Sequence, residues 1–308
     1  MKFTSIYIDY KVIIMPKAHV NSIEIEYDTF GDSSSKPLLL VMGLGGQMIA
    51  WLDELCEYMA NQGFFVIRFD NRDVGLSTKF EEKGIPNLSE LIPVFLGGEK
   101  VDPPYTLEDM ADDAIGVLDD LNIDKAHICG ASMGGMIAQI IAFRHPTRVL
   151  SLASIMSTTG NPDLPQATPE LLQELFSPPP TDREAYIKES VRRGRLTYGT
   201  FPYNEEQARI LSAAAFDRCF YPQGIMRQLA AIAANGNRKT KLASIKVPTL
   251  VVHGREDPLV PVEGGIDTAE AIPGAELLIV DGMGHSVPIE VVPQIIGAML
   301  ANAAKSKD

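Results

Sequence analysis

The sequence predicts an α/β protein with a mostly parallel central sheet, helices on both of its faces and a helical insertion. Three observations carry this prediction. Apolar runs of strand length alternate with longer helical segments along most of the 308 residues. Several strand-like runs are apolar at consecutive positions, which is typical of strands buried on both faces. The alternation stops over 160–240, where two proline clusters precede a helical stretch.

The first part of the chain is expected to supply three strands. These lie at 22–27, 37–42 and 64–69, with a helix at about 49–61. The second strand reads Pro-Leu-Leu-Leu-Val-Met, a continuous apolar run that indicates burial on both faces. A long connection punctuated by Gly and Pro follows over 81–105.

The middle of the chain continues the alternation. We expect a helix at 106–121, opened by Thr106 and the acidic residues Glu108 and Asp109, because such residues suit a helix amino terminus. A strand at 125–129, a helix at 133–144 and a strand at 148–155 are expected to follow.

The last part of the chain completes the core around the insertion. Two further strands and two helices are expected at 247–253, 262–272, 275–280 and 288–303. The insertion is expected to form helices at about 182–198, 204–217 and 222–234. The chain thus divides into a core of 1–159 and 241–308 and a helical cap of 160–240. Open α/β sheets bind ligands at the carboxyl ends of their strands, so we expect the cap to cover that edge.

Composition and charge narrow the classes of function. The chain is 45% hydrophobic and 22% charged, which excludes a disordered or collagen-like protein. Its 27 basic and 40 acidic residues give a formal net charge of −13, which argues against nucleic acid and anionic membranes as partners. A small molecule is the expected partner, and the sequence is compatible with a homo-oligomer.

Cysteines, apolar runs and the amino terminus bear on location. Cys56, Cys129 and Cys219 are too few and too scattered for a disulfide framework or a zinc site, and we expect no metal or cofactor. No apolar run reaches the roughly 18 residues of a membrane helix. Residues 1–14 alternate like a strand and lack a small-residue cleavage site, so we expect no signal peptide and a cytoplasmic protein.

Ser132 is the candidate nucleophile. It lies in Gly130-Ala-Ser-Met-Gly134, which follows an apolar strand and opens a helix. On such a turn the backbone is strained, the glycines let strand and helix approach, and the hydroxyl projects above the sheet edge. The helix amino terminus adds partial positive charge and free N–H groups. The Gly-x-Ser-x-Gly pattern is weak by itself, but its position between a strand and a helix makes it specific.

A serine hydroxyl needs a base that accepts its proton. His285 follows the last expected strand in a glycine-flanked loop, at the same sheet edge as Ser132, and is the candidate base. The other histidines have positions that suit structural roles. They are His19 before the core, His127 within a strand, His145 at a helix end, and His253 beside the loop of the candidate acid.

The base in turn needs an orienting carboxylate. Asp257 follows the penultimate strand at that same edge and is the first candidate. Glu256 and Asp281 remain alternatives, since the first is adjacent to Asp257 and the second is close to His285 in sequence. The order Ser132, Asp257, His285 is one of the known chain orders of such triads.

The chain resembles the α/β-hydrolase fold family from about residue 18 to residue 303. The resemblance is carried by Val41-Met-Gly-Leu-Gly-Gly46, Asp70-Asn-Arg-Asp-Val-Gly-Leu-Ser77, Gly130-Ala-Ser-Met-Gly134, and the loops of Asp257 and His285. Within the family it is similar to capped serine carboxylic ester hydrolases, in particular aclacinomycin methylesterase-like and 3-oxoadipate enol-lactonase-like proteins. These motifs are specific for fold and triad and say little about substrate.

The resemblance also implies an oxyanion hole made by the backbone N–H groups of Leu44 and Met133. Family members usually have His-Gly where this chain has Met42-Gly43. This departure leaves the backbone donors in place, and the glycines of the loop permit its turn.

A second departure lies in the stretch after the strand at 64–69. Asp73 stands where many relatives have glycine, and we expect a structural turn beneath the site there. Arg72 is expected to tie loops together through carboxylates. The adjacent acids Asp112 and Asp113 are expected to form a solvated face.

A nucleophilic serine points to acyl transfer, in which an acyl-enzyme forms and water releases the product. Haloalkane dehalogenases and epoxide hydrolases of this fold carry aspartate instead. We therefore expect a carboxylesterase for small or medium-chain esters. The alternative is a lactonase, C–C bond hydrolase or acyltransferase/perhydrolase with the same triad. A non-catalytic ligand receptor is a third class, which no feature of the sequence favours.

The acyl group is expected to meet apolar side chains of the first helix and the cap. The candidates are Trp51, Met156, Phe176, Phe201, Phe216 and Met226. Each of these residue types is more often found in a core than in a pocket. Arg192, Arg193 and Arg195 of the insertion are expected to face solvent rather than a charged substrate group.

Overall fold

The computed structural model describes residues 16–87, 91 and 102–306. The strand-like alternation of residues 1–14 and part of the 81–105 connection therefore lie outside the described residues.

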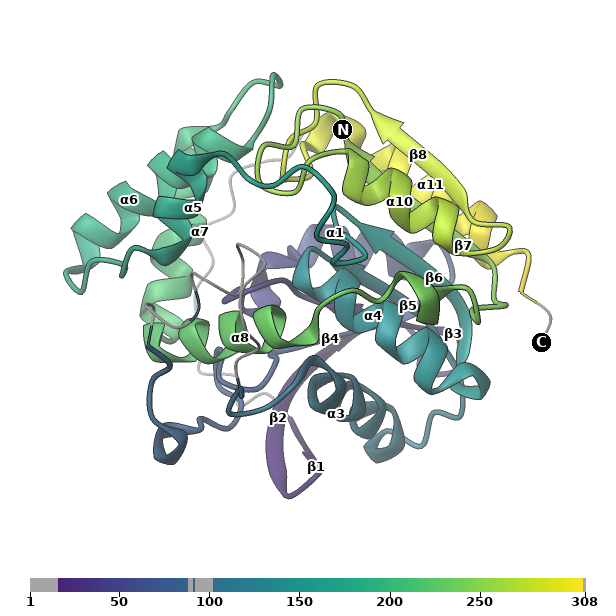
Figure 1. Ribbon diagram of the computed structural model, residues 1–308. Helices are drawn as coiled ribbons and strands as arrows, with labels where there is room; N and C mark the ends of the chain where they lie inside the picture. Colours follow the sequence, from purple (N-terminus) through teal and green to yellow (C-terminus); the bar gives the residue numbers. More distant parts are fainter. Residues whose placement is uncertain (1–15, 88–90, 92–101, 307–308) are drawn as a thin grey trace.

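The centre of the fold is one eight-stranded sheet with the order β1-β2-β4-β3-β5-β6-β7-β8 (Figure 1). Its strands are β1 (Lys17–Val20), β2 (Ile23–Phe30), β3 (Lys36–Val41), β4 (Phe64–Phe69), β5 (Ala126–Ala131), β6 (Val149–Ile155), β7 (Thr249–Gly254) and β8 (Glu276–Val280). The β1–β2 and β2–β4 pairs are antiparallel and all other pairs are parallel. The carboxyl ends of β3 to β8 therefore meet at one edge, as the α/β prediction requires.

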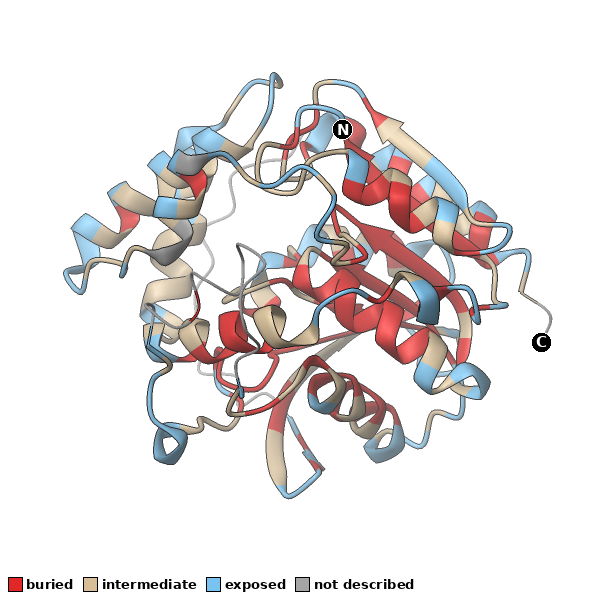
Figure 2. Ribbon diagram, viewed as in Figure 1, coloured by how far each residue is buried: buried red, intermediate tan, exposed pale blue. Residues whose placement is uncertain are grey.

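Helices cover both faces of this sheet and bury one apolar cluster on each face. One face carries α3 (Leu107–Asp120), α4 (Met133–Arg144) and α10 (Glu263–Ala271), and the other carries α1 (Asp53–Asn61) and α11 (Val292–Ala303). Figure 2 shows the inner strands of the sheet and α4 as largely buried, whereas β8 at the sheet edge is partly exposed. Residues 133–142 of α4 are all buried, which suits a helix that is apolar on every side.

The elements agree closely with the sequence prediction. β4 and α4 have the predicted bounds, and Thr106 caps α3 in a reciprocal capping box with Asp109. Among the elements that were not predicted are β1 and a helix at the start of the insertion. β1 has only four residues, too few for a periodic pattern, and α5 (Pro169–Phe176) lies in the proline-rich start of the insertion. Its proline occupies the first helical position, where a missing N–H costs nothing.

The insertion between β6 and β7 is the segment predicted to be a cap, and it is called the cap below. It contains α5, α6 (Arg183–Thr197), α7 (Glu205–Arg218) and α8 (Pro222–Asn235), and the short α9 (Lys239–Leu242) leads back to β7. In Figure 1, α5, α6 and α7 form a lobe beside the sheet, whereas α8 runs back toward the core. There α8 contacts α3, so the cap is joined to the core through this helix.

A buried ion pair fastens α8 to the core. Arg227 is 1% exposed, and its guanidinium contacts the Asp73 carboxylate twice, with Nε–Oδ2 at 2.7 Å and Nη2–Oδ1 at 2.9 Å. Asp73 has φ +67°, a region that favours glycine, the residue that many relatives have here. We infer that the bidentate contact with Arg227 compensates the backbone strain, since bidentate pairs are among the strong ones.

A second buried pair corrects one expectation. Arg72 contacts Asp113 with Nε–Oδ2 at 2.6 Å and Nη2–Oδ1 at 2.8 Å, as the predicted role of Arg72 requires. The expectation that Asp113 faces solvent is wrong, because it is 1% exposed. A buried guanidinium needs a carboxylate partner, and α3 supplies it. Asp112 instead pairs with the exposed Arg144.

Among the helices of the described residues, none combines the length and the apolar character needed to cross a membrane.

Breaking the Asp73–Arg227 pair from one side is expected to destabilise the protein strongly. Asp73→Asn or Arg227→Met leaves one buried charge without its partner, which costs about 3–5 kcal/mol. The double variant is expected to recover part of this loss, because no buried charge then remains unpaired. Denaturant unfolding of the four proteins measures the coupling free energy.

The exposed pair Arg183–Asp217 is the matched control. Its atoms are as close, at 2.7 Å, but both side chains lie largely in water. Asp217→Asn is therefore expected to have a much smaller effect on the free energy of unfolding. Equal losses at the two sites, or losses that simply add in the double variant, would contradict the coupled role of Asp73 and Arg227.

Candidate active site

Four loops from the carboxyl edge of the sheet form the candidate site. Ser132 follows β5, Asp257 follows β7, His285 follows β8, and Leu44 lies in the loop after β3. These strands are parallel members of one sheet, so residues distant in sequence come together at the edge where the strands end.

The turn at Ser132 is strained and tightly packed. Ser132 has φ +56° and ψ −121°, although it is not a glycine. A Cβ at Gly130 would lie 2.0 Å from the Gly134 carbonyl oxygen, and one at Gly134 would lie 2.1 Å from that of Val41. Only glycine therefore permits α4 to start this close to β5 and β3. The resulting turn presents the Ser132 hydroxyl at the sheet edge.

The three sequence candidates form a continuous hydrogen-bonded chain. Ser132 Oγ lies 2.9 Å from His285 Nε2, and His285 Nδ1 lies 2.7 Å from Asp257 Oδ2. The His285 side chain is 10% exposed and Asp257 is fully buried. An imidazole that donates through Nδ1 to a carboxylate keeps Nε2 free to accept the serine proton.

Asp257 is held as an ionised acceptor. Its Oδ1 accepts the Leu259 and Val260 N–H groups, each at 2.9 Å. Burial by itself would raise the pKa of Asp257, but contacts with His253 and His285 and the backbone hydrogen bond lower the pKa to about 2. His253 Nε2 lies 3.5 Å from Asp257 Oδ2 and 2.8 Å from the Val260 carbonyl oxygen. His253 thus supports the acid loop, as predicted.

The two alternative acids are occupied elsewhere. The Glu256 carboxylate accepts the Gly282 N–H, and Asp281 pairs with Arg255 at the surface. Of the three acids considered, Asp257 is the one in contact with the imidazole.

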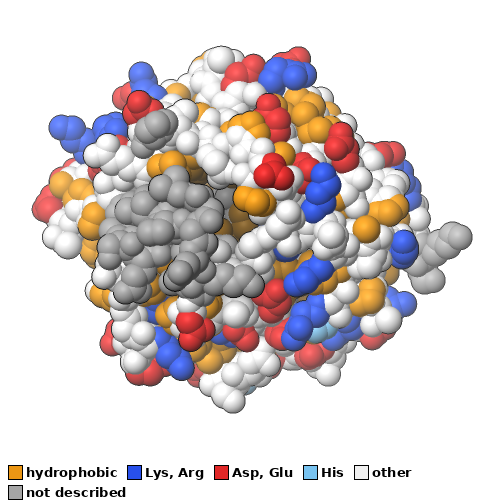
Figure 3. All heavy atoms as spheres, in the orientation of Figure 1, with side chains coloured by type: hydrophobic (Ala, Val, Ile, Leu, Met, Phe, Trp, Pro, Cys, Tyr) orange, Lys and Arg blue, Asp and Glu red, His pale blue; other side chains and the backbone are white. Residues whose placement is uncertain are grey.

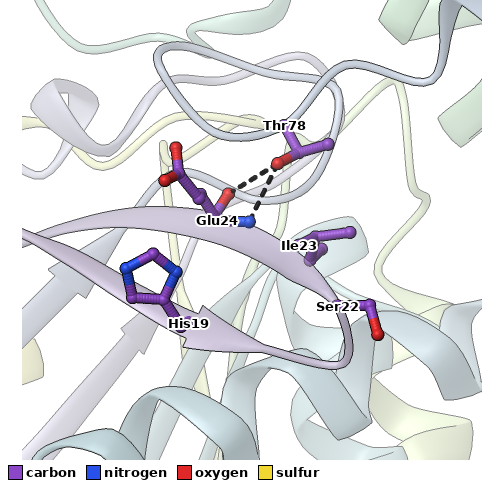
Figure 4. Close-up of a pocket in the computed structure, with 5 residues that line it drawn as sticks. All are labelled: His19, Ser22, Ile23, Glu24 and Thr78. Atoms are coloured by element: carbon purple, nitrogen blue, oxygen red, sulfur yellow. Dashed lines mark hydrogen bonds between the residues drawn. The ribbon is translucent and has the colours of Figure 1, made fainter.

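The remaining histidines lie in other settings. His127 is buried in β5 beside the Ser151 hydroxyl, and His145 contacts Asp112. His19 lies on the edge strand β1, where it lines a shallow pocket with Ser22, Ile23, Glu24 and Thr78 (Figure 4). The dashed lines there mark hydrogen bonds between the Thr78 hydroxyl and the Glu24 backbone. This pocket shares no residue with the Ser132–His285–Asp257 chain.

Two backbone N–H groups near Ser132 are available as donors. Within the described residues, neither the Leu44 N–H nor the Met133 N–H is used in a hydrogen bond to the protein. The neighbouring Gly46 N–H donates to the Gly43 carbonyl oxygen, and Gly43 packs against the Ser132 side chain. The arrangement suits an oxyanion hole, in which preorganised donors point to a developing negative charge.

Two amide side chains hold this loop and were not singled out from the sequence. Asn71 Nδ2 donates to the Met42 carbonyl oxygen at 2.9 Å, and Gln228 Oε1 accepts the Gly45 N–H at 2.8 Å. The one available signal was a glutamine among the apolar residues of Ile225-Met-Arg-Gln-Leu-Ala230, where a buried amide needs partners.

Five of the six apolar candidates can be placed, and they belong to three different packing groups. Trp51 and Met156 are buried in the core cluster, and Phe201 packs against it. Phe216 stacks with Tyr186 and Phe220 inside the cap, and Met226 packs beside Leu229. Phe176 lies in α5, and its side chain is outside the described residues. The five described candidates therefore do not share one packing group.

The cap arginines are paired with cap carboxylates. Arg192 and Arg193 contact Glu174 and Glu189, and Arg195 contacts Glu205. On the face drawn in Figure 3, basic and acidic side chains are interspersed over the surface. Within residues 16–87, 91 and 102–306, no group of three or more His, Cys, Asp or Glu side chains is placed to hold a metal ion.

Known proteins show the same architecture. Rhodomycin D methylesterase DauP of Streptomyces sp. (strain C5) is 27% identical over 94% of this chain and 98% of its own length. The 3-oxoadipate enol-lactonase 2 of Acinetobacter baylyi is 25% identical over 84% of this chain and 85% of its own. The crystal structure of an enol-lactonase from Burkholderia xenovorans LB400 superposes with a TM-score of 0.72 at 23% identity, over 94% of this chain and all of that one.

The family model for the alpha/beta hydrolase fold matches residues 36–291, most of the chain. With the sheet order and the relatives above, this match settles the family. The chain belongs to the alpha/beta hydrolase fold family of hydrolases.

Proposed function

We propose that the protein is a serine-dependent carboxylic ester hydrolase. The observation that carries the proposal is the Ser132–His285–Asp257 chain, with contacts of 2.9 and 2.7 Å, beside the unused N–H groups of Leu44 and Met133. Nucleophile, base, orienting acid and oxyanion donors are the four parts that acyl transfer needs.

In the proposed mechanism each part has one step. Ser132 Oγ attacks the ester carbonyl carbon while His285 Nε2 takes its proton. Asp257 stabilises the imidazolium that forms, and the Leu44 and Met133 N–H groups stabilise the oxyanion of the tetrahedral intermediate. His285 then protonates the leaving alcohol, which gives an acyl-enzyme. Water, activated by the same imidazole, releases the acid and restores Ser132.

The proposed substrates are small or medium-chain esters with an apolar acyl group. The methylesterase among the relatives supports ester hydrolysis, and the pairing of the cap arginines with carboxylates supports an uncharged substrate. Relatives named as an enol-lactonase and as a hydrolase of 2-hydroxy-6-oxononadienedioate keep lactonase and C–C bond hydrolase activities as the alternative. We further propose a cytoplasmic location.

Replacing the nucleophile tests the proposal directly. Wild type is expected to hydrolyse p-nitrophenyl esters in a series from acetate to dodecanoate, and the chain-length optimum measures the acyl site. Ser132→Ala is expected to lower kcat by about 10⁴–10⁶-fold, because the remaining groups give only residual catalysis. Initial rates over the series are the measurement.

Labelling by a fluorophosphonate separates two reasons for inactivity. If wild type is labelled at Ser132 but hydrolyses none of these esters, the triad assignment is retained and the proposed class of substrates is rejected. Lactones and methyl esters of larger ring systems would then be the next substrates. Absence of both labelling and hydrolysis would reject the proposal.

Replacing the acid tests its assignment. Asp257→Asn is expected to lower kcat by about 10³–10⁴-fold, because an amide no longer holds His285 in the tautomer that accepts the serine proton. Asp281→Asn is the control, since this exposed acid contacts Arg255 and not the imidazole. It is expected to leave kcat within about threefold of wild type, on the order of a surface substitution. The reverse ranking of the two variants would exclude Asp257 as the orienting acid.

The low pKa of Asp257 makes a prediction for the pH dependence. A carboxyl group with a pKa of about 2 stays ionised down to about pH 4, and the ionised form is the one that orients His285. Protonation of Asp257 therefore removes no activity above that pH. On the acid side, log kcat/KM is expected to fall by no more than about one unit per pH unit, because Asp257 takes up no proton there. A fall of two units per pH unit between pH 4 and 7 would contradict this.

A further inference from the structure

Gln228 of the cap helix α8 links two loops of the core. Its side chain is fully buried, and both ends of its amide are used. Oε1 accepts the Gly45 N–H at 2.8 Å, and Nε2 donates to the Arg72 carbonyl oxygen at 2.9 Å. Because one partner is an N–H donor and the other a carbonyl acceptor, the amide has only one orientation that satisfies both.

The bond to Gly45 lies one peptide group away from the candidate oxyanion donor. The peptide between Gly43 and Leu44 carries the unused Leu44 N–H, and the peptide between Leu44 and Gly45 is the one that Gln228 holds. On the other side, Asn71 holds the carbonyl oxygen of Met42. The donor peptide is therefore bracketed by two peptides whose orientations are set by buried amide side chains.

In the loop after β3 the Leu44 N–H is unused, whereas the two N–H groups that follow it are taken. The Gly45 N–H is taken by Gln228, and the Gly46 N–H is taken by the Gly43 carbonyl oxygen at 3.2 Å. Rotation of the donor peptide would break the bond between Gly43 and Gly46 and disturb the one to Gln228. The direction of the Leu44 N–H thus depends on the Gly45–Gln228 contact.

The face of α8 that carries Gln228 also packs against Gly45 through an apolar side chain. Gly45 has φ +66°, and a Cβ there would lie 2.8 Å from Ile225 Cγ1. Ile225 and Gln228 are three residues apart and so share a face of α8. The loop therefore meets an apolar side chain and a hydrogen-bond acceptor from the cap in one contact.

We propose that Gln228 is a positioning residue for the oxyanion hole, through which the cap sets the direction of the Leu44 N–H. This inference rests on the proposed ester hydrolase function. Gln228 acts through Gly45 and the loop, without touching the substrate. Since an oxyanion hole works only when its donors are preorganised at the right place, the cap helix is part of the catalytic machinery rather than a cover alone.

The test is the isosteric variant Gln228→Met, which removes both hydrogen bonds and keeps the volume. Complete loss of one oxyanion donor costs about 10²–10³ in rate, so a misdirected donor is expected to lower kcat by about 10–100-fold with little change in KM. The affinity for a trifluoromethyl ketone, which adds to serine as a tetrahedral oxyanion, is expected to fall by a similar factor. Rates are normalised to the fraction of sites titrated by a fluorophosphonate, so unfolded protein does not count.

Gln139→Met is the matched control. Gln139 of α4 is also fully buried, and its amide also bonds at both ends, to the Ser154 hydroxyl and to Arg238 Nε. It contacts no atom of the loop after β3 through these bonds. The variant is expected to lose stability as Gln228→Met does, and to keep kcat and inhibitor affinity per titrated site.

A second variant keeps the test informative if Gln228→Met does not fold. Gln228→Glu retains an oxygen that accepts the Gly45 N–H, so its loss of kcat is expected to be smaller than that of Gln228→Met, or below about tenfold where only this variant folds. The inference would be overturned if folded Gln228→Met kept wild-type kcat and ketone affinity, or if Gln139→Met lost both equally. It would also be overturned if Gln228→Glu alone folded and lost about a hundredfold or more. A wild type without esterase activity would reject the proposed function instead.

Discussion

The close approach of α4 to the ends of β5 and β3 is the constraint on which the rest of the site depends. Gly130 and Gly134 leave no room for a Cβ, and between them Ser132 is forced to a positive φ. Such strain persists only where the surrounding packing over-determines it, and here the packing is a helix buried along residues 133–142. The Ser132 hydroxyl and the Met133 N–H, which is the first N–H of α4, are consequently held in place by the same turn.

The cap contacts the core on both sides of the turn at Ser132. On one side, α8 supplies Arg227 and Gln228 to the loops after β3 and β4. On the other, the end of α6 meets the loop of the candidate base, where the His285 N–H donates to the Thr197 carbonyl oxygen at 2.6 Å. A Cβ at Gly284 would lie 2.2 Å from that same oxygen, so the approach requires glycine. The cap therefore contacts the loops that carry Leu44 and His285.

Local patterns predicted the framework and the triad geometry, because each depended on short-range signals. The apolar runs marked the strands, and the position of Ser132, Asp257 and His285 after separate strands was enough to place them at one edge. Contacts between distant segments carried no such signal. The sequence predicts a solvated face for Asp113, which in the structure pairs with Arg72. Gln228 was not singled out from the sequence, and it bonds to the distant Gly45. Their partners are fixed by tertiary packing alone.

Three arginines are paired with buried carboxylates, and one of them, Arg218, also contacts the buried Glu26. Arg72, Arg218 and Arg227 lie near one another in the fold, and each guanidinium faces a buried carboxylate, of Asp113, Asp70 and Asp73 respectively. Two charges lie within the candidate site itself: the partial positive charge at the amino terminus of α4, which begins next to Ser132, and the ionised Asp257, which contacts His285. The first favours negative charge on the substrate oxygen and the second favours positive charge on the imidazole. Both charges develop together when serine attacks an acyl carbon, which is why this arrangement suits acyl transfer.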